Sequence, residues 1–143
     1  LSDEDIVDVL ENISDGFFMV LAMMSGLELA IVSGRYSPAT DTRMKDLGVK
    51  HVLQGKRDKV EMIRPLLDEL GLGFSQVAFV GNELLDIKLA KHVGLPIAVA
   101  DANPELIKEV DFVTEHDGGK GAVREILQGY FEAAGIDPKE LIK

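Results

Sequence analysis

Short β-branched runs alternate with amphipathic helical patterns along this chain, and no other feature constrains its fold as strongly. Strands joined by helical crossovers form parallel sheets with helices on both faces. The alternation therefore predicts an α/β fold of three layers, with a mainly parallel sheet between helices. The runs typical of buried strands cover residues 27–32, 50–53, 76–80, 97–100 and 112–114.

Cap signals mark the ends of the helices between these strands. Ser37-Pro38 supplies an N-cap and a first-turn proline for a helix that we expect to end near residue 47, before Gly48. Asp58 and Glu61 have the spacing of a capping box and open a helix to about residue 70. Further helical segments are expected over 84–92 and 121–134, and after Asn103-Pro104 and Asp137-Pro138.

Composition narrows the possible partners. The 143 residues carry a formal net charge of −10, whereas nucleic-acid binders need a basic face. No apolar run approaches the roughly 20 residues of a membrane span. The chain has no cysteine, which fits a reducing cytoplasm, and its three histidines show no metal-ligand spacing. We therefore expect one cytoplasmic domain, residues 1–143, that binds neither nucleic acid nor membrane.

Three of the predicted strands end in residues that suit an anion and a hard cation. Ser33-Gly34-Arg35 follows the first strand, where a hydroxyl and free N–H groups can bind phosphate, although the same tripeptide also suits a helix-entry turn. Lys59 follows the second strand, at a helix start that disfavours cations unless an anion is near. Residues 81–86 follow the third and carry oxygen donors that suit magnesium, or acids that favour a helix start. Parallel strands bring these ends to one edge of the sheet, so together they predict phosphoryl chemistry.

These segments resemble motifs of haloacid dehalogenase-like phosphatases. Ser33-Gly34-Arg35 resembles the second motif, Gln54-Gly55 with Lys59 the third, and residues 81–86 the fourth. Residues 12–16, 93–96, 98–102 and 118–125 resemble flanking segments of the capless group that contains 3-deoxy-D-manno-octulosonate 8-phosphate phosphatase. The resemblance covers about residues 12–128.

The resemblance implies a Rossmann-like fold and a magnesium-dependent phosphatase that hydrolyses a sugar-acid phosphate through an aspartyl-phosphate. It also implies a homotetramer in which a hairpin or tail of one subunit approaches the neighbour's active site, with residues 118–125 near that interface. The implied roles are catalysis for Ser33 and Lys59, substrate binding for Gly34, Arg35 and Arg124, and magnesium binding for Asn82, Glu83 and Asp86.

Two departures from the family pattern matter. The Asp-x-Asp-Gly motif that carries the nucleophile should stand well upstream of Asn12, and residues 3–6 do not match it. The sequence is therefore expected to lack the N-terminal nucleophile strand. Asn82 stands where an aspartate is usual, and an amide oxygen binds magnesium without contributing charge.

A second interpretation rests on the same departures. Gly81-Asn82-Glu83 is similar to the fourth motif in the C-terminal phosphatase-like domain of animal CMP-sialic acid synthetases, which are acylneuraminate cytidylyltransferases. That resemblance implies an oligomerisation domain that is catalytically weak or inactive. Ser33, Lys59 and Asp86 favour the phosphatase, because a purely structural domain has no need of all three.

Overall fold

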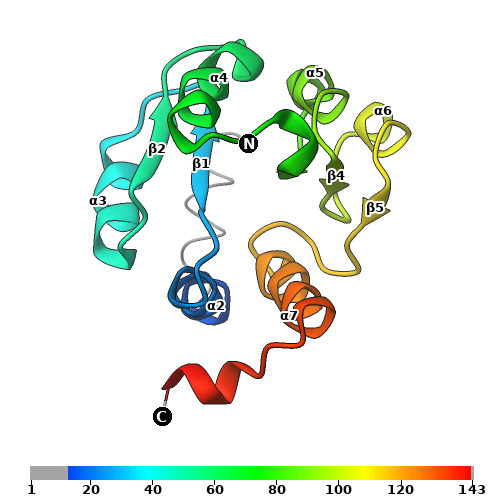
Figure 1. Ribbon diagram of the computed structural model, residues 1–143. Coiled ribbons are helices and arrows are strands. Elements are labelled where there is room, and N and C mark those ends of the chain that lie inside the picture. Colours follow the sequence, from blue (N-terminus) through cyan, green and yellow to red (C-terminus); the bar gives the residue numbers. More distant parts are fainter. Residues whose placement is uncertain (1–12, 143) are drawn as a thin grey trace.

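The computed structural model describes residues 13–142, with side chains from residue 16 onward. The expected start of the 12–16 segment and the unmatched acids at 3–6 lie outside the described residues. Strands and helices follow one another in the predicted order (Figure 1). The elements are α2 (Ile13–Met24), β1 (Ala30–Ser33), α3 (Pro38–Leu47), β2 (His51–Gln54), α4 (Lys59–Leu70), η1 (Phe74–Gln76), β3 (Ala78–Gly81), η2 (Leu84–Asp86), α5 (Ile87–Ala90), β4 (Leu95–Ala98), α6 (Pro104–Ile107), β5 (Phe112–Val113), α7 (Ala122–Ala134) and η3 (Pro138–Ile142).

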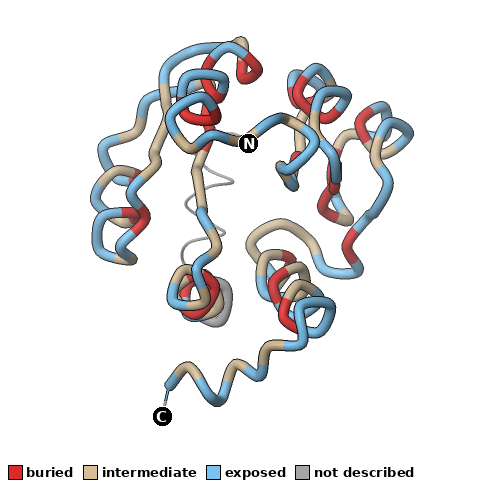
Figure 2. The backbone as a smooth tube through the Cα atoms, viewed as in Figure 1, coloured by how far each residue is buried: buried red, intermediate tan, exposed pale blue. Residues whose placement is uncertain are grey.

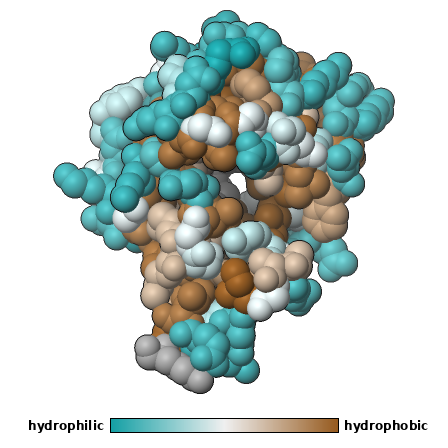
Figure 3. Space-filling model, in the orientation of Figure 1, coloured by the Kyte–Doolittle hydropathy of each residue, from teal (hydrophilic) through white to brown (hydrophobic). Residues whose placement is uncertain are grey.

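The described strands form two parallel sheets, where the sequence predicted one. β1 pairs with β2, and β3, β4 and β5 form the second sheet in that order. Every pairing is parallel, as the helical crossovers predicted. Among residues 13–142, β1 and β3 are not hydrogen-bonded to each other, so each is an edge strand. The face seen in Figure 1 is hollowed near its middle, with apolar residues around the hollow (Figure 3).

Helices cover both faces of the β1–β2 sheet, which confirms the predicted layers. Side chains of a strand alternate between faces. Ile31 packs against a cluster built by α2, α3 and α7, whereas Val32 belongs to a cluster with α4 and α5. Val52 and Leu53 of β2 divide between the same two clusters. Figure 2 shows the buried residues on the sides of the helices that face the interior.

α2 and α7 lie side by side, although one opens and the other nearly closes the described chain (Figure 1). The rings of Phe18 and Phe131 are 6.3 Å apart between centroids, and Phe131 is almost fully buried. None of the helices in the described part of the chain is long and apolar enough to cross a membrane.

The predicted caps of α3 and α4 are confirmed. Ser37 accepts a hydrogen bond from the Thr40 N–H, and Asp58 accepts one from the Glu61 N–H. Gly48 and Gly71 end these helices in the left-handed conformation that favours glycine.

The single helix expected over 84–92 was wrong. The structure has a 3₁₀ turn, η2, followed by the short helix α5, which ends at Ala90. The carboxylate of Asp86 turns back to accept from the N–H groups of Asn82 and Glu83, both at 2.9 Å. These bonds tighten the turn that precedes α5. Such 3₁₀ turns are frequent at the ends of α-helices.

Candidate functional site

The end of β1 carries a buried hydroxyl. Ser33 is 0% exposed and lies opposite Gln54 in the β1–β2 register. The Arg35 N–H donates to Ser33 Oγ at 3.3 Å, and the Gly55 N–H donates to the Ser33 carbonyl at 3.1 Å. A Cβ atom placed on Gly34 would lie 3.5 Å from the Lys56 carbonyl oxygen. The loops that follow the two strands are therefore in direct contact.

Gln54 holds the loop after β1 in place. Its Oε1 accepts from the Ser37 N–H at 2.9 Å, and its Nε2 donates to Asp41 Oδ1 at 2.8 Å. From the sequence, Gln54 was identified only as part of a motif, and no role was predicted for Asp41. Spacing along the chain could not reveal the contact, since it spans 13 residues and two elements.

Lys59 and Asp86 form a buried ion pair. Lys59 Nζ lies 2.5 Å from Asp86 Oδ1, and the two residues are 5% and 0% exposed. The other carboxylate oxygen accepts the two N–H bonds of Asn82 and Glu83. Burial raises the pKa of Asp86, but nearby positive charge, that of Lys59 included, and the two N–H donors outweigh it and hold this pKa below its ordinary value.

The start of α4, which carries Lys59, packs against β1, which ends in the buried serine. Val32 and Val60, which precede Ser33 and follow Lys59 in the chain, belong to one buried cluster. Lys59 begins α4, and Asp86 closes η2 just beyond β3. The structure thus unites the predicted third and fourth motifs through Lys59 and Asp86. A buried ammonium and hydroxyl near strand ends can bind and neutralise a phosphoryl group.

Asn82 and Glu83 differ from Asp86 in what holds them. The Asn82 carbonyl accepts the Asn103 N–H at 2.8 Å, which ties β3's end to the loop after β4. Both residues are partly exposed, whereas Asp86 is enclosed by its donors. Within residues 13–142, no group of three His, Cys, Asp or Glu side chains is placed to hold a metal.

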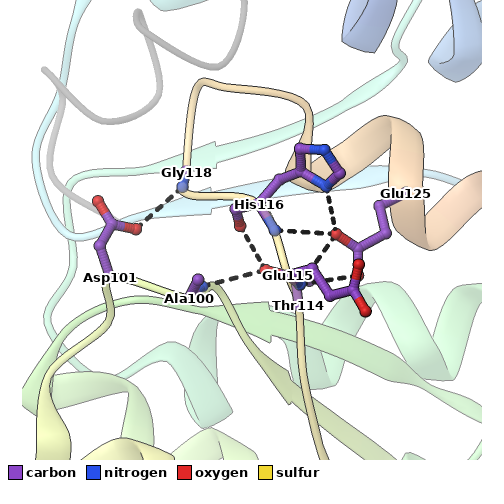
Figure 4. Close-up of polar contacts among 7 residues, drawn as sticks. All are labelled: Ala100, Asp101, Thr114, Glu115, His116, Gly118 and Glu125. Atoms are coloured by element: carbon purple, nitrogen blue, oxygen red, sulfur yellow. Dashed lines mark hydrogen bonds and ion pairs between the residues drawn. The ribbon is translucent and has the colours of Figure 1, made fainter.

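A second polar cluster borders the end of β4 (Figure 4). Asp101 Oδ1 accepts the Gly118 N–H at 2.9 Å, and the buried Thr114 hydroxyl links the Ala100 N–H to the His116 carbonyl. Glu125 of α7 accepts from the N–H of Glu115 and of His116. These contacts fix residues 114–118, which lead into the glycine-rich loop 118–121, and the sequence patterns did not predict them.

The carboxylate of Glu125 also meets the His116 ring, with Oε1 2.7 Å from Nδ1. Burial raises the pKa of Glu125, but the hydrogen bond to His116 and the backbone donors outweigh it and lower this pKa. Arg124, next to it on α7, places its guanidinium carbon 5.1 Å from the centroid of the Phe18 ring. This contact directs Arg124 toward α2, and its predicted role with substrate stays a prediction.

A family model described as haloacid dehalogenase-like hydrolase matches residues 51–127, more than half of the chain. This match includes Lys59, Asn82, Asp86 and the loop up to Glu125.

The chain belongs to the haloacid dehalogenase-like hydrolase family.

Named relatives of this haloacid dehalogenase-like chain agree with the match. It is 41% identical over 115 residues to the 3-deoxy-D-manno-octulosonate 8-phosphate phosphatase KdsC of Escherichia coli K12, which covers 80% of this chain and 61% of that protein. The KdsC protein of Yersinia pestis is 38% identical over 115 residues, with 62% of its length covered. The chain thus spans about three fifths of the length of these curated relatives.

Solved structures share the fold. The 3-deoxy-D-manno-octulosonate 8-phosphate phosphatase of Yersinia pestis superposes with a TM-score of 0.84 at 36% identity, over 87% of this chain and 67% of that one. The enzyme of the same name from Moraxella catarrhalis, solved with a magnesium ion, a phosphate ion and a KDO molecule, gives 0.82 at 35% identity, over 85% and 70%. The α/β fold with parallel strands is therefore confirmed.

Proposed function

We propose that this protein is a magnesium-dependent phosphatase that hydrolyses a sugar-acid phosphate such as 3-deoxy-D-manno-octulosonate 8-phosphate. The observation that carries the proposal is the buried Lys59–Asp86 pair at the start of α4, a helix that packs against β1, the strand that ends in the buried Ser33. A lone ammonium in a core is costly, and one held by a carboxylate at a strand end can meet an incoming phosphoryl group. The names of the KdsC relatives support the substrate class.

Each residue of the site has a distinct part in this proposal. The Ser33 hydroxyl donates to an oxygen of the transferring phosphoryl group, and Lys59 neutralises its charge. Gly34 gives the substrate access to the backbone, and Arg35 binds its anionic oxygens. Asp86 orients Lys59 and holds the Asn82–Glu83 turn, since its two oxygens accept from all three residues.

The proposed nucleophile is an aspartate on a strand between β1 and β3. An oxygen of its carboxylate would attack phosphorus while the phosphorus–oxygen bond to the sugar breaks, and the sugar alkoxide would take its proton from water. The hydroxide left from that water would then cleave the acyl-phosphate, regenerate the aspartate and release inorganic phosphate. Two facing edge strands, β1 and β3, support such a strand, because a parallel sheet with helices on both faces normally continues across its centre. Asp86 is unsuited to the attack, since Lys59 and two N–H groups occupy its oxygens.

The oxygen donors at the end of β3 provide only part of a magnesium site. Asn82 and Glu83 offer an amide and a carboxylate oxygen at the end of β3, and hard cations prefer such ligands. The bound ion would supply a positive charge that polarises the phosphoryl oxygens. The proposed nucleophile aspartate would add a further charged ligand to Glu83, since residues 13–142 bring no group of three such side chains together.

A second candidate function is an assembly domain that performs no catalysis. Asn82 favours it, because an amide in place of a carboxylate weakens magnesium binding. The engaged oxygens of Asp86 point the same way, since they leave fewer ligands for an ion.

Three further features belong to the proposed phosphatase. We infer a homotetramer that acts in the cytoplasm, with residues 118–125 near a subunit interface. The firm anchoring of this segment by Asp101 and Glu125 supports a role in assembly. In this arrangement Arg124 helps other cations to bind the carboxylate of a substrate held by a neighbouring subunit.

The deciding experiment measures phosphate release from 3-deoxy-D-manno-octulosonate 8-phosphate with magnesium and after chelation. The phosphatase predicts release that requires the ion. If the full-length protein releases no phosphate at any magnesium concentration but forms a stable oligomer in light scattering, the assembly domain is the better description.

A further inference from the structure

Three exposed cations gather on the two loops that frame the buried serine. Arg35 lies two residues after Ser33 on the loop after β1, and Lys56 and Arg57 lie on the loop after β2. The loops touch, because the Gly55 N–H donates to the Ser33 carbonyl and Gly34 packs close to the Lys56 carbonyl. We call Arg35, Lys56 and Arg57 the cationic rim.

The charges of the rim are not neutralised within the described part of the chain. The ion pairs of residues 13–142 use other cations, and no hydrogen-bonded carboxylate faces the three rim side chains. Nearby acids are engaged elsewhere. Asp58 Oδ2 lies 2.5 Å from Lys88 Nζ, and Asp41 accepts from Gln54.

Three neighbouring cations without a carboxylate partner among the described residues are unexpected in a protein with this many acidic residues. The chain has 25 acidic and 15 basic residues, so partners for three cations are plentiful. Like charges held on adjoining loops repel one another, and Lys56 and Arg57 also precede α4, whose positive end disfavours cations. An anion bound among the three side chains would remove both penalties.

We propose that Lys56 and Arg57 bind a second anionic group of the substrate, a carboxylate, while its phosphate occupies the site of Ser33 and Lys59. The inference rests on the proposed function and adds its specificity. An octulosonate 8-phosphate carries a carboxylate and a phosphate at opposite ends of its carbon chain. Arg35 is the member of the rim nearest to Ser33 in the chain, and a guanidinium can fork two carboxylate oxygens.

The cationic rim would favour substrates that carry a second negative group, a selection that Lys59 and Ser33 alone cannot make. Lys59 and Ser33 recognise any phosphomonoester, because every such group has the same oxygens. Two cations at a fixed place on the neighbouring loop reward only a substrate with a second negative group. Their removal should therefore weaken binding of sugar acids and spare simple phosphomonoesters.

The test measures binding of free 3-deoxy-D-manno-octulosonate by calorimetry, which needs no turnover. Lys56→Gln with Arg57→Gln should bind it at least about tenfold more weakly than the unaltered protein, since charge-assisted hydrogen bonds contribute more than neutral ones. The matched control is Lys45→Gln with Lys50→Gln, which removes two exposed, unpaired lysines near the opposite end of β2. The control should bind as the unaltered protein does.

Further variants and a kinetic arm separate this inference from the proposed function. Lys56→Arg with Arg57→Lys should restore binding, because it keeps both charges. In turnover, the glutamine pair should raise KM for the sugar-acid phosphate and leave kcat, and both constants for p-nitrophenyl phosphate, unchanged. A protein that binds the sugar acid through the rim without releasing phosphate would contradict the phosphatase and sustain the rim. Failure of the unaltered protein to bind the sugar acid, or equal binding by the glutamine pair, would overturn the rim.

Discussion

Lys59 Nζ and Asp86 Oδ1 lie 2.5 Å apart in the core, and this contact joins the start of α4 to the turn after β3. The two residues are separated by 27 positions in the chain. Their pairing fixes the geometry of two motifs at once, because Asp86 also holds the N–H groups of Asn82 and Glu83.

Replacement of Lys59 by alanine should abolish phosphate release and weaken the fold. The change leaves the buried Asp86 carboxylate without its cation, which typically costs about 3–5 kcal/mol in the free energy of unfolding. Loss of the positioned charge should lower kcat by roughly 10²-fold or more. Phosphate-release assays and urea denaturation check the two effects.

Two control variants complete that experiment. Lys59→Arg keeps the charge and should retain more stability than alanine. Lys88→Ala breaks the exposed pair with Asp58 and should change stability little, because water screens that pair. Full activity in Lys59→Ala would remove Lys59 from the proposed site.

Stability should fall as the solution is acidified. The folded-state pKa values of Asp86 and Glu125 lie below their ordinary values of 3.8 and 4.5. The unfolded chain therefore takes up protons first, and the stabilisation from these groups, complete above about pH 5, is lost as the pH drops through the ordinary values toward the folded ones.

Urea titrations between pH 7 and pH 3 measure this dependence. Asp86→Asn cannot titrate, so its unfolding free energy should be lower than that of the unaltered protein at pH 7 and should decline less toward acid. An identical pH slope in the variant and the unaltered protein would show that Asp86 does not carry the effect.

Replacement of Asn82 by aspartate should tighten magnesium binding, because a carboxylate adds the charge that the amide lacks. Titration calorimetry with magnesium compares the two proteins. Gln128→Glu, which adds the same charge at an exposed position of α7, serves as the control and should leave magnesium affinity unchanged. Equal affinity in Asn82→Asp would exclude residue 82 as a ligand.

Local signals in the sequence predicted what depends on neighbours in the chain. Ser37, Asp58, Gly48 and Gly71 cap and end their helices as expected, because a cap is a contact over about three residues. The succession of strands along the chain and their parallel pairing also followed from the crossover pattern, whereas the division of the described strands into two sheets did not.

Contacts between distant elements could not be predicted in this way. Gln54 meets Asp41 across two elements, and Glu125 meets His116 across the glycine-rich loop. Each pair requires the tertiary placement of both partners, which no periodicity encodes. The 3₁₀ turn at Leu84–Asp86 was not predicted either, although its contacts are local, because Asp86 turns back toward the N–H groups of Asn82 and Glu83 instead of extending the helix.

Gly94 should tolerate no side chain. A Cβ atom placed there would lie 2.0 Å from the Ser75 carbonyl oxygen, which belongs to the backbone and cannot move aside cheaply. Gly94→Ala should lower the free energy of unfolding by about 3 kcal/mol or more. Gly129→Ala on α7 is the control, where nothing lies within 4 Å, and it should raise stability by up to about 1 kcal/mol. Thermal denaturation of both variants checks the contrast, and equal stabilities would contradict the close approach at Gly94.

Glu125→Gln should loosen the loop 118–121. The carboxylate accepts the N–H groups of Glu115 and His116 and meets the His116 ring, and glutamine offers one oxygen in place of two. Amide hydrogen exchange should therefore quicken over residues 115–120, while exchange in β1 and β2 should stay unchanged. Glu132→Gln removes the same charge from an exposed position farther along α7 and should leave the loop protected. Unchanged exchange over residues 115–120 in Glu125→Gln would contradict this role of Glu125 and would mean that the bonds of Thr114 to His116 and of Asp101 to Gly118 hold this segment without it.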